Sequence, residues 1–378
     1  MVANKAFSLP YFSLLTFSFF TFHLPFPISQ LPTLISQLSM SRLHLIIYIA
    51  AATFLTLTAC GNSKKAKNRQ PKVEAQVVGP QFSADSAYLF CQQQCDFGPR
   101  TMNSEAHEQC GQWIVSKFQS YGMHVTEQRA TLTGYDGTRL LSNNIIAAFR
   151  PEATDRILLC AHWDSRPWAD NDPDEANWHK PVMAANDGAS GVAVMLEIAR
   201  LLSLEDTTLH PSLGVDFICF DAEDWGTPQW YDKATGGNTW ALGAQHWAAH
   251  PHREGYKARY GILLDMVGGQ GARFYQEGVS LYYAKKVVDR VWQAAHTCGY
   301  ASLFPKEHGG DITDDHGPVN EVAGIPCIDI IPYYPDCAES SFGPTWHTLN
   351  DDMQHIDANT LKAVGQTLVQ VLYTENLQ

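Results

Sequence analysis

Three acidic side chains occupy four consecutive positions in the stretch ICFDAEDW, directly after an apolar run. Asp221, Glu223 and Asp224 lie where a buried strand is expected to end. Carboxylates this close to one another repel, and both burial and like charge raise their pKa values. A divalent cation placed among them would offset the repulsion. The stretch is therefore the first candidate for a metal-dependent catalytic site.

Other acids and histidines lie in comparable places along the chain. They are His162 and Asp164 after the run 157–161, Asp187 in AANDGASG, Asp265 after the run 261–264, Asp314, Asp315 and His316 in the predicted loop GGDITDDHGP, and His347 in PTWHTLNDD. In open α/β sheets, ligands bind beyond the carboxyl ends of the strands, so we expect these side chains to converge there. Oxygen and imidazole ligands without a thiolate suit zinc in an open catalytic site.

Each of these residues also has a purely structural interpretation. A lone Asp-Gly such as Asp187 is more often the N-cap of a helix than a ligand. The convergence of several carboxylates is what favours a metal site over these alternatives. His162 could be a histidine at a strand end whose hydrogen bonds are made within the protein, and Asp221 could be a turn residue. Asp351 and Asp352 could be charges at the start of the last helix. Surface or loop positions are the interpretation for His179, His246, His250 and His252.

The adjacent pair Glu223 and Asp224 can divide its roles. Neighbouring side chains near a strand end point in different directions, so one can bind a metal while the other faces the substrate. A carboxylate that is held near a cation without ligating it is suited to general acid–base catalysis.

Short, continuously apolar runs alternate with helical patterns over most of the chain. Two-sided apolar strands of this kind are typical of parallel sheets that are covered on both faces. We therefore expect a single α/β domain with a mostly parallel, twisted central sheet and helices on both faces. The runs are NNIIAAF, RILLCAHWD, GVDFICFDAED, YGILLDMVG and GIPCIDIIPYY, and the predicted helices include 84–95, 190–204, 238–249, 280–298 and 357–373.

The N-terminal region resembles an export signal. Arg42 precedes an apolar stretch over 45–58, and Cys60 follows small residues in LTAC. We expect a lipoprotein signal peptide over 40–59 and a polar tether over 60–81 that follows a lipidated Cys60; a plain signal peptide or a short anchor is the alternative. Residues 1–39 are expected to be an upstream extension outside the true start at Met40. The catalytic domain is then 82–378, exported and lipid-anchored on the periplasmic face of a bacterial membrane.

The net charge limits the classes of binding partner that are expected, and the cysteine content bears on disulfides. A net charge of −13 and a pI near 5.5 argue against nucleic acid, because phosphate binding needs a basic face. The membrane is expected to be contacted only through the lipid anchor. Nine cysteines are present, and spacing alone assigns no disulfide pairs. Cys160, Cys219 and Cys327 lie in apolar runs, where buried thiols are expected.

Several short motifs resemble a known family. HWDSRP, NDGASG, DAED, LLDMVG and WHTLND occur in the order of the zinc aminopeptidase-like M28 superfamily, and DFGPR, TDDHGP and IPYYP resemble its glutaminyl cyclase branch. The resemblance covers nearly the whole stretch from Phe82 to the end. It implies an enzyme that converts the N-terminal glutamine of peptides and proteins to pyroglutamate with release of ammonia.

The resemblance also implies roles for individual residues. One zinc per chain would be held by Asp187, Asp224 and His347, and Glu223 would shuttle the proton. The other implied roles are hydrogen bonding in the active site for Asp265 and Asp315, and lining of the substrate pocket for Trp346 and for Trp225, with Trp230 as a competitor for the second aromatic position.

Two features depart from the superfamily pattern. Asp224 stands where the metal ligand is usually the longer glutamate, which would draw the loop closer to the metal or lengthen one bond. His162 and Asp164 are also present and are candidates to support the metal ligands without binding the metal, although in two-zinc peptidases such a histidine binds the second metal. An M28-type zinc aminopeptidase is therefore the alternative function. A third hypothesis is a non-enzymatic lipoprotein with a decayed site, against which intact Asp187, Glu223 and His347 argue.

Overall fold

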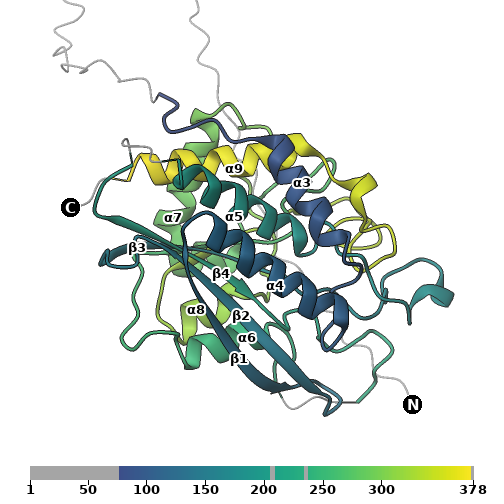
Figure 1. Cartoon of the computed structure of the whole chain (residues 1–378). Helices are drawn as coiled ribbons and strands as arrows, with labels where there is room; N and C mark the ends of the chain where they lie inside the picture. The colour runs from purple at the N-terminus through teal and green to yellow at the C-terminus, as the bar shows by residue number, and fades with distance from the viewer. Residues whose placement is uncertain (1–75, 205–208, 234–236, 376–378) are drawn as a thin grey trace, which may run out of the picture. The chain divides into compact units, whose positions relative to one another are not determined.

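A six-stranded mixed sheet forms the centre of the chain (Figure 1). The computed structural model describes residues 76–204, 209–233 and 237–375. The strand order is β1-β2-β4-β3-β5-β6. The strands are β1 (His124–Thr133), β2 (Arg139–Phe149), β3 (Asp155–His162), β4 (Leu213–Phe220), β5 (Gly261–Leu264) and β6 (Cys327–Ile330).

The strand pairing confirms the predicted fold class and refines it. Strands β4, β3, β5 and β6 are parallel neighbours. Strands β1 and β2 form an antiparallel hairpin that joins the sheet through β2. The sequence analysis did not predict β1, because its residues are half-buried or exposed and form no continuous apolar run.

Helices cover both faces of the sheet, as predicted (Figure 1). One face carries α3 (Ala84–Cys95), α4 (Glu105–Ser120), α5 (Ala189–Leu202), α7 (Gly278–Thr297) and α9 (Ala358–Tyr373), and the other carries α6 (Leu242–Ala249) and α8 (His316–Glu321). Helix α8 was predicted to be loop. It has six residues and includes Gly317 and Pro318, so it lacks the apolar periodicity by which a helix is recognised.

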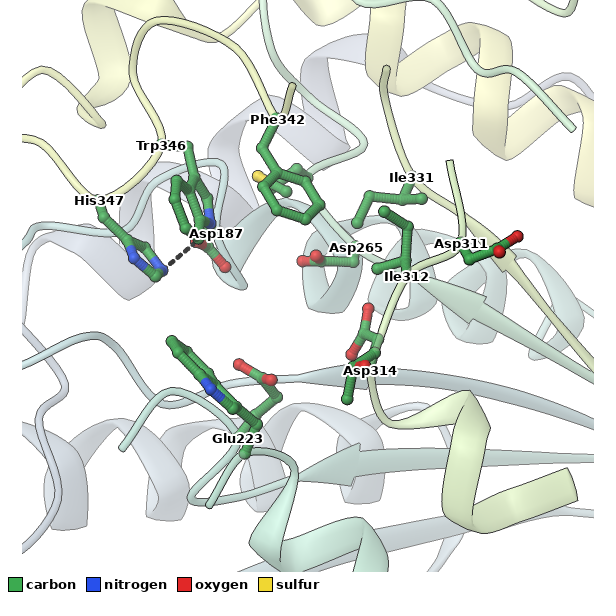
Figure 2. Close-up of a pocket in the computed structure, with 13 residues that line it drawn as sticks. Asp187, Glu223, Asp265, Asp311, Ile312, Asp314, Ile331, Phe342, Trp346 and His347 are labelled. Atoms are coloured by element: carbon green, nitrogen blue, oxygen red, sulfur yellow. Dashed lines mark ion pairs between the residues drawn. The ribbon is translucent and has the colours of Figure 1, made fainter. Parts of the chain in front are cut away.

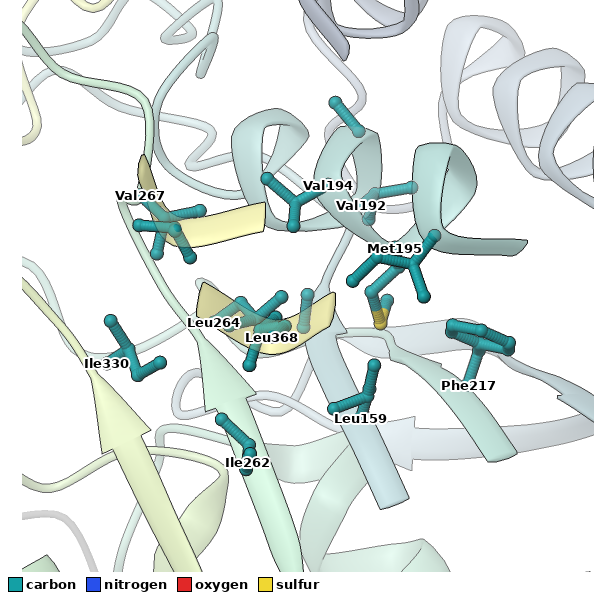
Figure 3. Packing of buried hydrophobic residues seen from close by; sticks show 14 of the residues in the cluster. Leu159, Val192, Val194, Met195, Phe217, Ile262, Leu264, Val267, Ile330 and Leu368 are labelled. Carbon is teal, nitrogen blue, oxygen red and sulfur yellow. The ribbon is translucent and has the colours of Figure 1, made fainter. Parts of the chain in front are cut away.

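Alternate residues of the central strands enter two separate apolar cores. Leu159 packs in the core beneath α5, whereas its neighbour Leu158 packs on the opposite face against α6 and α8. Figure 3 shows Val192 and Met195 of α5 directed toward Leu159 and Phe217 of the sheet. Each such buried side chain contributes about 1.5–3 kcal/mol to folding. The two cores fix the sheet rigidly, and with it the loops at its carboxyl edge.

The beginning of the described chain is tied to the C-terminal helix. Gln370 of α9 accepts a hydrogen bond from the amide of Val78 at 2.8 Å and donates one to the carbonyl of Gln76 at 3.0 Å. The chain therefore packs on the domain ahead of Phe82, where the tether was predicted to end. The segments predicted at 1–39 and 40–59, and residues 60–75 of the tether, lie outside the described residues.

All eight cysteines within the described ranges are free thiols, and Cys160, Cys219 and Cys327 are buried as predicted. In the same ranges, no helix combines the length and the apolar character that crossing a bilayer requires.

A buried ion pair between neighbouring strands gives a stability prediction. Arg156 of β3 donates to Asp216 of β4 at 2.5 and 2.6 Å, and Tyr256 donates to the same carboxylate at 2.7 Å. Asp216→Ala would leave a buried guanidinium without its carboxylate, so we expect the free energy of unfolding to fall by about 3–5 kcal/mol. Urea denaturation followed by circular dichroism measures this loss.

The matched control is Arg129→Ala, which removes two largely exposed ion pairs, with Glu108 and with Glu127. Exposed pairs contribute about 1 kcal/mol or less. Equal losses in the two variants would contradict the stabilising role of the buried pair.

Candidate active site

The acids that sequence analysis singled out meet at the carboxyl edge of the parallel strands. Asp187 precedes α5, Glu223 and Asp224 follow β4, Asp265 follows β5, and His347 comes from the loop ahead of α9. A cavity of about 250 Å³ lies among them. Figure 2 shows Asp187, Trp346 and His347 on one side of this hollow, Glu223 on the opposite side, and Asp265 and Asp314 toward a third side. Trp240, Ile331 and Phe342 also line it.

Asp187, Asp224 and His347 form one compact group of candidate metal ligands. One donor atom from each lies within 4.8 Å of the others. His347 Nε2 is 3.2 Å from Asp224 Oδ1 and 3.6 Å from Asp187 Oδ2. Both carboxylate oxygens of Asp224 are buried, and neither accepts a hydrogen bond from the described residues. Buried oxygens of this kind need a partner, and a divalent cation fits this donor set.

A second group shares Asp187 with the first. Donor atoms of His162, Asp187 and Asp265 also lie within 4.8 Å of one another. His162 Nε2 is 2.8 Å from Asp187 Oδ1 and 3.3 Å from Asp265 Oδ1. Asp187 thus lies between two groups, in the position that a bridging ligand of two metals would take.

The turn that carries Glu223 and Asp224 is held from two directions. Asp164 accepts the backbone N–H groups of both residues, Glu223 on Oδ1 and Asp224 on Oδ2, each at 3.1 Å. Arg166 donates to the Asp224 carbonyl at 3.1 Å. Ala222 just before the pair has a φ of 54°, an uncommon conformation for a residue with a side chain. These bonds explain how the crowded acids are kept in place, and they give Asp164 a positioning role.

Asp221, the third acid of the stretch, belongs to the scaffold. Its carboxylate is fully buried and lies 2.8 Å from His107 Nε2 on α4. It also accepts the amides of Asn143 on β2 at 2.6 Å and of Ala222 at 2.9 Å. The residue therefore joins a helix, a strand and the active-site turn, as the structural interpretation proposed.

Asp351 supports the site in a way that sequence analysis did not foresee. It was interpreted as a charge at the start of the last helix. Instead it is buried and accepts the backbone amides of Asn186 at 2.7 Å and Asp187 at 3.1 Å. Burial, reinforced by the charge of Asp187, raises the pKa of Asp351 to about 7. The sequence offered no indication of this contact, because it joins segments that are far apart in the chain.

Asp170 and Arg166 form a second unforeseen support. Arg166 donates to both oxygens of Asp170 at 2.7 Å. Asp170 Oδ1 in turn lies 3.5 Å from His347 Nδ1. A carboxylate on the far nitrogen fixes the ring of a metal-binding histidine and leaves its other nitrogen for the metal. His347 itself has a φ of 55°, so the loop directs this ring through an uncommon backbone conformation.

Two tryptophans stack on His347. Trp346 lies 3.7 Å from it between ring centroids, and Trp240 lies 5.8 Å from it with the rings only 11° from parallel. Both also line the cavity. Trp346, which the resemblance implied as a substrate-binding residue, thus lies at this cavity.

Trp225 and Trp230, the two candidates for the second aromatic position, belong to a neighbouring aromatic cluster. Neither borders the cavity. Both pack against Trp168, at centroid distances of 5.2 and 6.0 Å. Trp225 also fits closely over Gly134, where even a methyl group would come within 2.6 Å of the indole nitrogen. Trp240, further along the chain, is the other tryptophan that lines the cavity.

Several acids of the site hold protons more tightly than usual, whereas the contact with His162 lowers the pKa of Asp187. Burial raises the pKa of Glu223 well above its ordinary value, and the nearby Asp224 adds to the effect. Burial and the charge of Asp187 raise the pKa of Asp265 to about 8. Burial and the adjacent Asp314 likewise raise that of Asp315. Close carboxylates of this kind titrate as a group and share protons.

Asp314 and Asp315 are placed differently relative to the cavity. Asp314 lines it, whereas Asp315 is fully buried beside it. Neither oxygen of Asp315 has a hydrogen-bond partner among the described residues. Asp315 is therefore available to hydrogen-bond with a neighbouring acid but does not face the hollow itself.

The chain thus combines a mixed α/β sheet with acids and a histidine gathered beyond the carboxyl ends of its parallel strands. The chain belongs to peptidase family M28, whose model matches residues 144–372. A crystal structure of glutaminyl cyclase from Bacteroides thetaiotaomicron, bound to N-acetylhistamine, is 52% identical, has a TM-score of 0.76, and covers 79% of this chain and 100% of its own.

Curated relatives include proteins with two different activities. Aminopeptidase YwaD of Bacillus subtilis is 28% identical over 69% of this chain and 50% of its own length. Glutaminyl-peptide cyclotransferase of Boiga irregularis is 26% identical over 62% of this chain and 66% of its own length. The chain thus spans between half and about two thirds of these relatives.

Proposed function

We propose that this protein is a glutaminyl-peptide cyclotransferase, which closes the N-terminal glutamine of peptides and proteins to pyroglutamate and releases ammonia. The observation that carries the proposal is Glu223, a buried carboxylate that faces a small, aromatic-walled cavity beside a metal-binding triad. A cavity of about 250 Å³ lies below the usual range for drug-sized ligands and suits a single side chain. The likeness to a solved glutaminyl cyclase supports the same reaction.

Asp187, Asp224 and His347 would hold one zinc ion per chain. The buried oxygens of Asp224, which accept no hydrogen bond among the described residues, and the donor set of two carboxylates and one imidazole support this assignment. A bound zinc supplies a Lewis acid that polarises the γ-amide carbonyl of the substrate. Asp164, Asp170 and the other supporting residues keep the three ligands in place.

The chain's own residues would carry the proton. The α-amine of the substrate attacks its own γ-amide carbon, so no water molecule needs activation. Glu223 takes a proton from that amine and delivers it to the departing nitrogen, which leaves as ammonia. Asp265 and Asp315 hydrogen-bond with Glu223 or with the leaving nitrogen while a proton is shared among the acids. Trp240 and Trp346 bury the glutamine side chain and exclude water.

An M28-type zinc aminopeptidase is the second candidate. The group His162, Asp187 and Asp265 supports it, because these residues have the geometry to hold a second metal that shares Asp187 with the first. Two bridged metals would generate the hydroxide that peptide hydrolysis needs.

A dipeptide that begins with glutamine separates the two functions. The purified protein is incubated with Gln-Ala-amide while ammonia and peptide mass are followed. Release of ammonia from an otherwise intact peptide supports the cyclotransferase. Appearance of free glutamine supports the aminopeptidase and overturns the proposal.

The aromatic wall of the cavity gives a testable prediction at Trp240. Trp240→Ala removes a ring that lines the cavity and stacks on His347. We expect KM for Gln-Ala-amide to rise about tenfold or more, because burying an aromatic contact is worth at least about 1.5 kcal/mol. Steady-state ammonia release measures the change.

Trp225→Ala is the matched control, since it removes the same side chain from the neighbouring aromatic cluster. We expect it to leave KM within about twofold of wild type. A larger effect at Trp225 than at Trp240 would show that the wall has been assigned to the wrong tryptophan.

We also propose that the protein is exported and anchored by a lipid on Cys60 to the periplasmic face of a bacterial membrane. The signal-like pattern of residues 40–60 supports this. Peptides and proteins with N-terminal glutamine would then be its partners in that compartment. Mass spectrometry of the membrane-bound protein tests the proposal, and a mature chain that retains residues 40–59 would contradict it.

A further inference from the structure

A second hollow lies directly behind one wall of the active-site cavity. It has a volume of about 340 Å³. Residues 312–314 line both spaces, so this short segment is the partition between them. The far side of the second hollow is formed by α6 and α8 and their flanks, including Gln245, Pro318, Glu321 and Val322.

Main-chain groups at this partition are free to hydrogen-bond with a peptide that enters the site. The amide of Ile312 is used, because it donates to Glu277 Oε1 at 2.9 Å and so fixes the segment. Asp311 and Thr313, on either side of it, take part in no hydrogen bond among the described residues, and both are exposed. Unpaired main-chain groups beside a cleft are the feature through which proteins bind extended peptides.

The charge around the two hollows has one sign. Asp311 stands exposed at the rim of the cavity, and Glu321 stands exposed at the second hollow. Asp314 lines both spaces. Among the described residues, neither lining includes a lysine or an arginine. A positively charged side chain would therefore meet complementary charge along this path.

We propose that the second hollow is a subsite for the residues that follow the N-terminal glutamine, and that it favours a basic side chain at the third or fourth position. The inference rests on the proposed function. The glutamine fills the inner cavity, and the second residue crosses the partition at Ile312 and Thr313. Each extended residue advances about 3.3 Å, so the next residues enter the outer hollow beside Glu321. The natural substrates would then be polypeptides with basic N-terminal segments rather than free glutamine derivatives.

Three substrates test the subsite: glutamine amide, Gln-Ala-Lys-Ala-amide and Gln-Ala-Glu-Ala-amide. For the wild-type protein we expect kcat/KM to be about three- to tenfold higher for the lysine peptide than for the glutamate peptide, mostly through KM. Glu321→Lys should lower this ratio at least threefold, and Glu321→Gln should lower it by less. Glu321 is exposed, and its side chain accepts a hydrogen bond only from the exposed Tyr283 among the described residues, so both variants should fold.

Asp85→Lys is the matched control, because it makes the same charge change on an exposed residue of α3, on the other face of the sheet. It should leave the lysine-to-glutamate ratio as in wild type. An equal ratio in wild type and Glu321→Lys, or the same drop in Asp85→Lys, would overturn the subsite while ammonia release from glutamine amide still upholds the cyclotransferase. If none of the three substrates releases ammonia, the result contradicts both the subsite and the cyclotransferase function.

Discussion

Glu223→Gln is expected to lower ammonia release from Gln-Ala-amide by about 10²- to 10⁴-fold, the usual contribution of a general acid–base group. The amide has nearly the shape of the carboxylate but cannot take up the amine proton. Glu223 is buried and lines the cavity beside the candidate ligands. Its loss should therefore appear in kcat, because the group acts on the transferring proton rather than on substrate binding.

The same variant should keep its metal and its stability. Asp164 holds the turn through the backbone amides of Glu223 and Asp224, and the substitution leaves both amides unchanged. Zinc content by mass spectrometry and thermal unfolding serve as internal controls. Asp265→Asn is a useful comparison. Because Asp265 is assigned only a supporting hydrogen bond, this substitution should lower turnover less than Glu223→Gln does. Turnover near that of wild type in Glu223→Gln would remove Glu223 from the mechanism.

The sheet could be predicted from sequence because its buried strands are continuous apolar runs. Strands β3, β4, β5 and β6 each follow this pattern, and every residue of β4, β5 and β6 is buried. Strand β1 faces solvent over much of its length and has no such pattern. Helix α8 is too short to repeat its apolar face. Apolar patterns therefore did not reveal a strand that is buried on one side only, or a helix that is too short.

The residues brought together at the site could be predicted because they lie at strand ends or in short motifs. The residues that hold them in place could not be predicted. Asp351 and Asp170 contact Asp187 and His347 across large separations in the chain, and nothing local marks a buried acid that accepts backbone amides. The position of Trp240 depends on the path of a long loop, which composition does not determine.

The short acid at position 224 becomes understandable in this setting. A shorter side chain must bring its backbone closer to the shared ligand position. Asp164 accepts a hydrogen bond from the amide of Asp224, and Arg166 donates one to its carbonyl, so the backbone is held on both sides of this residue. With the backbone held there, Asp224 Oδ1 reaches within 3.2 Å of His347 Nε2. The scaffold, rather than the length of the side chain, sets the ligand position.

Removal of the metal is expected to abolish turnover and to destabilise the fold together. Dialysis against a chelator should eliminate ammonia release, and one equivalent of zinc per chain should restore it. A ligand that binds only the folded state stabilises it by about 2.7 kcal/mol at 100 times its Kd. The metal-free protein should therefore melt at a lower temperature, because the carboxylates of Asp187 and Asp224 are then left close together without a cation.

Two histidine variants separate the one-metal from the two-metal arrangement. His347→Ala removes a ligand of the proposed zinc, so we expect it to lose both bound metal and turnover. His162→Ala removes a ring that contacts Asp187 at 2.8 Å but belongs only to the second group, so it should retain one zinc per chain and measurable ammonia release. Two zinc ions in the wild type, with one lost in His162→Ala, would instead favour the aminopeptidase. The decisive quantity is therefore the number of metals per chain in the two variants, measured beside the product formed.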